Sequence, residues 1–285
     1  FFGSSLPTRQ EQCEAYKHIL NSLAPNPVTI RTLDSGGDKL VSELSLSNEA
    51  NPFMGWRSIR VCLDREELFK DQLKALLQAN EKGNLRILLP MISGLPELRK
   101  SKEHIKTCLA ELAEEGIECP SVEIGIMIEV PAAVMQVEQL AKEADFFSIG
   151  TNDLIQFTLA VDRSNEMIAD MFQPHHPAIL NMIYNTVIAA HKEGIPVAVC
   201  GEMSADPFSI LLLIGLGVDE LSMTPWSIMK AKKIIRSINY EDVNEIALRT
   251  LRFDDAASVD SFLHQRFAQA FADLGITSYV PAQKI

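Results

Sequence analysis

The 285-residue sequence predicts an α/β fold and, within that class, a (β/α)8 TIM barrel. Three short apolar runs, each followed by a helix-start signal, predict buried parallel strands that lead into helices: 122–128, 146–149 and 197–199. Strand-like and helix-like patterns alternate along nearly the whole chain, and its length is normal for one such barrel. Polar residues follow each run, at the strand ends where barrel enzymes place their catalytic groups. The pattern therefore indicates an enzyme.

The first half of the chain supplies strands and helices in alternation. Its expected elements are a helix over 6–23, a strand over 28–32, a polar loop over 33–55, a strand over 58–63, a helix over 64–80, a strand over 85–91 and a helix from 96 to 116. Thr8 is the candidate start of the first helix. Asp64, with Glu67 three residues later, forms a capping-box pattern for the second. Pro96 suits a first helical turn, and Gly116 suits a helix end.

The second half continues the alternation to the C-terminus. It is expected to hold strands over 122–128, 146–149, 197–199 and 220–223, helices that begin near 131, 153 and 206, a helix over 225–237, and terminal helices over 240–251 and 258–274. We expect one domain over 1–285, with the barrel in 1–238 and C-terminal helices of the same domain in 239–285. Seven strands are expected where a closed barrel needs eight, so the first strand is expected at or before Phe1 and Phe2, truncated in this chain.

Charge and cysteine content narrow the class of protein. The formal net charge of −12 disfavours nucleic acid and anionic membranes as partners. The longest uncharged apolar stretch, 208–218, is too short to span a bilayer. Five cysteines, odd in number and without a C-x-x-C spacing, argue against a disulfide framework and a zinc ribbon. They favour a protein of the reducing cytoplasm.

Glu129 and Asp153 are the candidate metal ligands. Each follows the end of an expected strand, and two carboxylates suit Mg²⁺, which binds few protein oxygens and leaves positions for water and phosphate. The alternative is that each carboxylate caps a helix, since Asp153 could cap the helix that follows it. Their shared position at strand ends favours the metal site.

Three arginines and one cysteine are the other candidates. Arg31, Arg57 and Arg163 could bind phosphate and carboxylate through paired guanidinium hydrogen bonds, or each could form a structural ion pair. Cys200 ends an expected strand beside Gly201. It could be a small buried hydrophobic residue, or in this position a proton donor to carbon.

The chain resembles the phosphoenolpyruvate-utilising family, and within it the C-terminal domain of enzyme I of the bacterial phosphotransferase system. The resemblance covers nearly the whole chain in family order. The matching segments are 30–34, 36–39, 51–57, 128–132, 150–154, 160–163 and 200–203.

The resemblance implies a role for each candidate. The Mg²⁺ ligands fall on Glu129 and Asp153, and the acid that protonates the enolate carbon falls on Cys200. The phosphoenolpyruvate-binding groups fall on Arg31, Arg57, Asn152, Asp153 and Arg163. It further implies a TIM barrel of the phosphoenolpyruvate/pyruvate superfamily and a homodimer. The implied reaction transfers phosphoryl to a histidine on a separate N-terminal domain, which feeds a phosphocarrier protein and releases pyruvate.

Two features of the family pattern lie outside this sequence. The R-[TS]-E segment of the first strand, which carries a further substrate arginine, would precede Phe1. The G-G-x-x-S-H motif of the acceptor histidine does not occur, so none of the six histidines inherits that role.

Two other functions compete with this one. The chain could be a fragment of pyruvate phosphate dikinase or phosphoenolpyruvate synthase, although residues 160–165 favour enzyme I. It could instead be a non-catalytic dimerisation domain that senses phosphoenolpyruvate, although such a sensor would not need the Cys200 acid. Residues 28–34 and 211–223 weakly favour the nitrogen-regulatory branch over the sugar-uptake branch.

Overall fold

A computed structural model describes residues 6–34, 49 and 51–275. The chain divides into two compact units, each built of parallel strands and helices. The first comprises Phe1–Met127 with Glu143–Phe146, and the second comprises Ile128–Lys142 with Phe147–Ile285.

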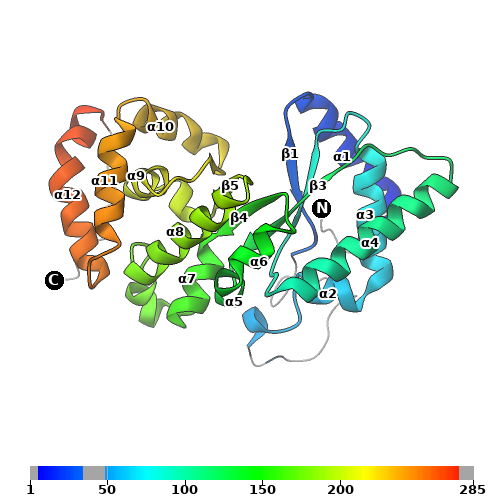
Figure 1. Ribbon diagram of the computed structural model, residues 1–285, viewed down its shortest axis with the longest axis horizontal. Coiled ribbons are helices and arrows are strands. Elements are labelled where there is room, and N and C mark those ends of the chain that lie inside the picture. The colour runs from blue at the N-terminus through cyan, green and yellow to red at the C-terminus, as the bar shows by residue number, and fades with distance from the viewer. Residues whose placement is uncertain (1–5, 35–48, 50, 276–285) are drawn as a thin grey trace. The chain divides into compact units, whose positions relative to one another are not determined.

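The first unit holds three parallel strands in chain order, β1-β2-β3. Its elements are α1 (Arg9–Leu23), β1 (Val28–Arg31), η2 (Pro52–Met54), α2 (Ile59–Asp64), α3 (Glu66–Ala79), β2 (Leu85–Leu89), α4 (Leu95–Glu114) and β3 (Glu123–Ile128), whose last residue belongs to the second unit. Parallel strands need crossover connections, and helices of this length supply them. Helix α3 packs against both α1 and α4 (Figure 1).

Helix α1 begins where its sequence predicts. The Thr8 side chain accepts a hydrogen bond from the Glu11 backbone N–H, and the Glu11 carboxylate accepts one from the Thr8 backbone N–H. This capping box satisfies two N–H groups that the helix leaves unpaired. Tyr16 and Leu20, which are buried, then anchor the helix to the unit.

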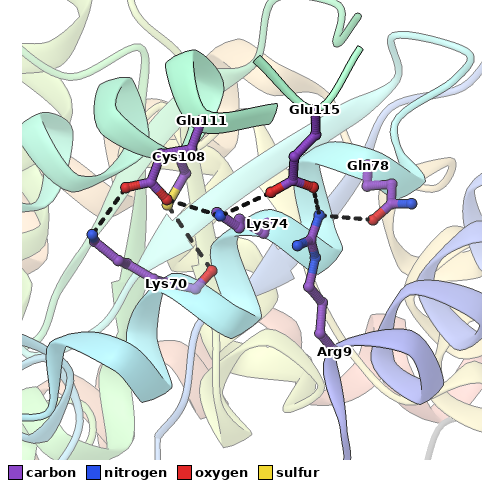
Figure 2. A network of polar contacts seen from close by, with 7 residues as sticks. All are labelled: Arg9, Lys70, Lys74, Gln78, Cys108, Glu111 and Glu115. Atoms are coloured by element: carbon purple, nitrogen blue, oxygen red, sulfur yellow. Dashed lines mark hydrogen bonds and ion pairs between the residues drawn. The ribbon is translucent and has the colours of Figure 1, made fainter. Parts of the chain in front are cut away.

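Charged side chains tie α1, α3 and α4 together at the surface (Figure 2). Arg9 of α1 lies 3.0 Å from the Glu115 carboxylate, directly after α4. Lys74 of α3 lies 2.8 Å from Glu111 and 3.2 Å from Glu115, and Lys70 lies 3.1 Å from Glu111. The network links the three helices through shared ion pairs, although solvent weakens each separate pair.

The second unit holds the other three parallel strands, in the order β4-β5-β6. Its elements are α5 (Pro131–Met135), α6 (Val137–Ala141), β4 (Phe146–Gly150), α7 (Thr151–Leu159), η3 (Glu166–Met171), α8 (Pro177–Lys192), β5 (Val197–Cys200), η4 (Glu202–Ser204), α9 (Pro207–Gly215), β6 (Glu220–Leu221), α10 (Pro225–Ile235), α11 (Tyr240–Thr250) and α12 (Ala256–Asp273). Phe146, the first residue of β4, belongs to the first unit. All five residues of β4 are buried, as expected for a strand covered on both faces.

Helices α9 and α11 approach each other closely at Gly215. A Cβ atom there would lie only 2.4 Å from the carbonyl oxygen of Val243. Helix α9 is apolar nearly throughout and is buried along most of its length, while its N-terminus is capped by the Asp206 side chain, which accepts from the Ser209 N–H. This packing joins α11 to α9 within the second unit.

The α/β class with parallel strands is confirmed, but one expected strand is wrong. The described residues carry six strands, because residues 59–63 lie in helix α2 and Ser58 is its N-cap. Ile59 and Cys62, three residues apart, are both fully buried on the inner side of that helix. A short apolar run fits either a buried strand or a buried helix, and here tertiary packing decides for the helix.

The predicted capping box at Asp64 is also wrong. Asp64 is the last residue of α2, and α3 begins at Glu66 after Arg65, which makes no side-chain cap. The first strand expected near Phe1 and Phe2 lies outside the described residues, as does the segment 36–39. No helix in the described part of the chain is long and apolar enough to cross a membrane.

Candidate functional site

Two turns meet at the carboxyl ends of β4 and β5. Gly150, at the end of β4, stands opposite Cys200, at the end of β5. The hydroxyl of Thr151 donates to the carbonyl oxygen of Cys200 at 2.9 Å, and the side-chain oxygen of Asn152 accepts from the Glu202 N–H at 3.1 Å. Each turn therefore holds the other in place, which fixes Cys200 beside the first turn of α7.

The sulfur of Cys200 has two polar neighbours from β4. The hydroxyl of Ser148 donates to Sγ at 3.6 Å, and the Cys200 thiol donates to the carbonyl oxygen of Ile149 at 3.6 Å. Ser148 is buried, whereas Cys200 is only half-buried. The thiol is thus held by contacts with β4 and remains partly exposed to solvent.

Gly201 makes the turn after Cys200 possible. Its φ of 104° lies in a region that side-chain-bearing residues rarely adopt. A Cβ atom at this position would lie 2.4 Å from Oγ1 of Thr151 and 3.0 Å from Oδ1 of Asn152. The close approach of the two turns therefore depends on a residue without a side chain.

Glu129 and Asp153, the predicted metal ligands, are both buried, with 3% and 7% of their surface exposed. Glu129 lies between β3 and α5, and Asp153 lies in the first turn of α7, which packs against α5. Asp153 is the third residue of that helix and Gly150 is its N-cap, so Asp153 is not the N-cap residue. In the described part of the chain, no cluster of three or more His, Cys, Asp and Glu residues forms a metal site. Two carboxylates nevertheless match the small number of protein ligands that Mg²⁺ uses beside a phosphate.

Arg163 lies near Asp153. Its guanidinium nitrogen is 4.0 Å from the Asp153 carboxylate, and its backbone N–H donates to the Gln156 side chain at 3.1 Å. The chain reaches this position because Ala160 adopts a left-handed conformation that ends α7. With a side-chain exposure of 37%, the guanidinium remains accessible to an anion.

Arg31 and Arg57 share one carboxylate in the first unit. Asp34 lies 3.1 Å from each guanidinium, and it also accepts a hydrogen bond from the Ser58 hydroxyl. Burial raises the pKa of Asp34, but the positive charge of Arg31, the Ser58 hydrogen bond and Arg57 outweigh it and hold that pKa below its ordinary value. Asp34 therefore stays ionised and fixes the two arginines in position. Arg57 is buried, and the Arg31 side chain is 48% exposed.

The sequence-predicted site residues thus form groups within each unit. Arg31 and Arg57 lie in the first unit, and the second unit holds the others: Glu129, Asn152, Asp153, Arg163 and Cys200. Asp34, Ser148 and Thr151 take part in these contacts without having been singled out. A serine inside the apolar strand that begins at Phe146 was the available signal for Ser148.

The chain matches the family model described as PEP-utilising enzyme, PEP-binding domain, over residues 2–240. Curated relatives include a protein named phosphoenolpyruvate-protein phosphotransferase from Geobacillus stearothermophilus, 45% identical over 268 residues, which are 94% of this chain and 46% of that protein. The protein of the same name from Haemophilus influenzae is 44% identical over 261 residues, 91% of this chain and 45% of that one. The chain therefore spans about half the length of the curated relatives it matches.

Solved structures of similar fold are more distant in sequence. Malate synthase of Haloferax volcanii, in its lead(II) complex, is 16% identical with a TM-score of 0.54, over 96% of this chain and 67% of that one. A citrate lyase of Burkholderia xenovorans is 16% identical with a TM-score of 0.50, over 98% of this chain and 95% of that one. At this identity the likeness concerns the fold alone. The sequence match over residues 2–240 is what assigns the family: the chain belongs to the PEP-utilising enzymes, as their PEP-binding domain.

Proposed function

We propose that this chain is the phosphoenolpyruvate-binding catalytic domain of a phosphoenolpyruvate-protein phosphotransferase. It would transfer phosphoryl from phosphoenolpyruvate to a histidine on a separate N-terminal domain and release pyruvate. The observation that carries the proposal is the Cys200 turn, since it presents a half-buried thiol beside the turn that carries Asn152 and Asp153. A thiol so held suits proton transfer at carbon, and the curated relatives bear the name of such an enzyme.

The arginines supply the charge that an anionic substrate needs. Phosphoenolpyruvate carries a phosphate and a carboxylate, and Arg31, Arg57 and Arg163 would bind them. The Asp34 carboxylate supports this role, because it orients the first two guanidinium groups before any ligand arrives. In a chain with a net charge of −12, the two arginines held by Asp34 supply the local positive charge that an anion needs. Asn152 and Asp153 would complete the substrate contacts.

Glu129 and Asp153 would hold a divalent cation. Both are buried carboxylates, one directly after β3 and the other in the first turn of α7. Oxygen donors of this kind fit Mg²⁺. When bound, the ion would stabilise negative charge on the phosphate and on the enolate oxygen.

Cys200 would then complete the reaction at carbon. As the phosphoryl group leaves for the acceptor histidine, the Cys200 thiol gives its proton to the methylene carbon and becomes a thiolate, and pyruvate forms. In the reverse direction the thiolate removes a proton from the methyl group of pyruvate. A pure sensor of phosphoenolpyruvate would need neither step.

The remaining partners follow from the same function. A downstream phosphocarrier protein would receive the phosphoryl group from the histidine-bearing domain, and the catalytic domain would form a homodimer. The five cysteines, all free thiols, support a location in the reducing cytoplasm.

The function is tested by separating binding from chemistry in the full-length protein. Cys200→Ala should bind phosphoenolpyruvate as the parent does and lose exchange of pyruvate methyl protons with solvent. Cys119→Ala, which removes another half-buried thiol, is the matched control and should exchange normally. Exchange at the parent rate in Cys200→Ala would assign the acid to another residue.

The metal ligands are tested by calorimetry of phosphoenolpyruvate binding. Glu129→Gln and Asp153→Ala should weaken binding as strongly as removal of Mg²⁺ does, because both carboxylates would hold the ion. Asp170→Asn, which changes an exposed carboxylate, is the control. Undiminished binding in both variants and in the absence of Mg²⁺ would exclude the metal site.

A further inference from the structure

Ser148 carries a buried hydroxyl that contacts the Cys200 sulfur and has no part in the reaction proposed above. It is 4% exposed and lies in a strand whose other residues are two phenylalanines, an isoleucine and a glycine. A buried hydroxyl costs free energy unless it is hydrogen-bonded, and an alanine would fill this place in the strand without that cost. The hydroxyl of Ser148 donates to Cys200 Sγ at 3.6 Å.

The strand register explains how two side chains so far apart in sequence meet. Ser148 pairs with Ala198, and Gly150 pairs with Cys200. Alternate residues of a strand point to the same face, so Ser148 and the position of Gly150 share the face on which Cys200 lies. Because Gly150 carries no side chain, the Cys200 sulfur can reach across toward Ser148.

The two hydrogen bonds of the sulfur differ in what proton transfer does to them. The bond to the Ile149 carbonyl needs the thiol proton, and it is lost once that proton leaves. The Ser148 hydroxyl can donate to sulfur in both states and donates more strongly to the anion. The serine hydroxyl therefore favours the thiolate.

Charged groups on the surrounding elements act on the same equilibrium between thiol and thiolate. Three carboxylates lie on the elements that contact β5: Glu202 of η4, Glu220 of β6, and Asp153 of α7, whose Thr151 hydroxyl donates to the Cys200 carbonyl oxygen. Carboxylates disfavour a nearby thiolate, while Arg163, after α7, partly neutralises Asp153 at 4.0 Å. The Ser148 hydroxyl is a neutral donor in direct contact with the sulfur, at 3.6 Å.

We propose that Ser148 is the positioning residue for the Cys200 thiol, and that its hydrogen bond sets the rate and the pH range of proton transfer between sulfur and carbon. The role rests on the proposed function. When the S–H bond breaks and the C–H bond of pyruvate forms, sulfur keeps the electron pair, and the Ser148 hydroxyl stabilises that thiolate. In the reverse step the same thiolate, held in place, takes the proton from the methyl carbon.

The test measures the thiol itself, in the full-length protein. The rate of Cys200 alkylation by iodoacetamide is followed against pH by peptide-resolved mass spectrometry, with Cys13, in the other unit, as the internal reference. In Ser148→Ala the apparent pKa of Cys200 should rise by about one unit, so that thiolate falls about tenfold at a given pH below the pKa. An unchanged Cys200 profile in this variant would overturn the proposal.

A second pair of variants keeps the test decisive if Ser148→Ala folds poorly. Ser148→Thr and Ser148→Val have nearly the same shape and differ in the hydroxyl. Threonine should keep the parent profile and valine should show the rise in pKa. The same profile in both variants would overturn the proposal.

Exchange of pyruvate methyl protons separates this inference from the function on which it rests. If the parent exchanges protons, Ser148→Ala should do so about tenfold more slowly at neutral pH, with unchanged affinity for phosphoenolpyruvate. Exchange by Ser148→Ala at the parent rate and with the parent pH profile would overturn the role of Ser148 alone. Absence of exchange in the parent would overturn the proposed function, while the alkylation profiles would still report whether Ser148 acts on the thiol.

Discussion

Gly201→Ala should disrupt the turn that carries Cys200, and the structure shows why. The backbone at Gly201, with φ 104° and ψ −173°, lies in a region that is nearly exclusive to glycine, at a cost of about 1–3 kcal/mol for any other residue. The new methyl group would also lie 2.4 Å from Oγ1 of Thr151. Thr151 is fully buried, and moving it would break its hydrogen bond to the Cys200 carbonyl, at a further cost of about 1–3 kcal/mol.

The total expected loss in the free energy of unfolding is about 2–6 kcal/mol. Gly194→Ala is the matched control, because Gly194 also has a positive φ, of 75°, but a Cβ atom there would contact nothing within 4 Å. The control should lose only about 1–2 kcal/mol, the backbone cost alone. Urea unfolding followed by far-UV circular dichroism measures both variants.

A double-mutant cycle identifies the contact responsible. Thr151→Ala should be less harmful in the Gly201→Ala background than in the parent, since it removes the atom that the new methyl group meets. Equal losses in Gly201→Ala and Gly194→Ala, or additive effects in the cycle, would refute the reasoning.

Two further predictions concern ionisation. The pKa of Asp34 lies below its ordinary value of 3.8, so its ionised form contributes stability that is present above that pH and is lost as pH falls through the lower, folded-state pKa. The stability difference between the parent and Asp34→Asn, measured by urea unfolding, should therefore shrink from pH 5 toward pH 3, and a constant difference would contradict this. Burial raises the pKa of Cys62 to about 12 and that of Cys108 to about 11. Neither thiol should react with iodoacetamide at pH 8 in the folded protein, because only about one Cys108 side chain in a thousand is ionised at that pH. In urea, all five cysteines should react. Rapid labelling of Cys62 or Cys108 in the folded protein would contradict the effect of burial on their pKa values.

The sequence by itself determined the elements whose signals are local. The Thr8 capping box is complete within four residues, so the start of α1 could be predicted, and the strands β3, β4 and β5 follow from short apolar runs. The positions of Glu129, Asp153 and Cys200 after strands also follow from the chain order, since parallel strands end on a common edge.

Tertiary structure alone decided the features that join distant residues. The run 58–63 has no preference strong enough to choose between strand and helix, and its buried surroundings place it in α2. Asp34 contacts Arg57, which lies 23 positions away in the sequence, and Ser148 contacts Cys200, which lies 52 positions away. Such contacts depend on strand register and on how closely two turns approach, and neither is encoded within a single segment. For that reason the position of Cys200 at a strand end could be predicted from the sequence, but the groups that contact its sulfur appear only once the chain is folded.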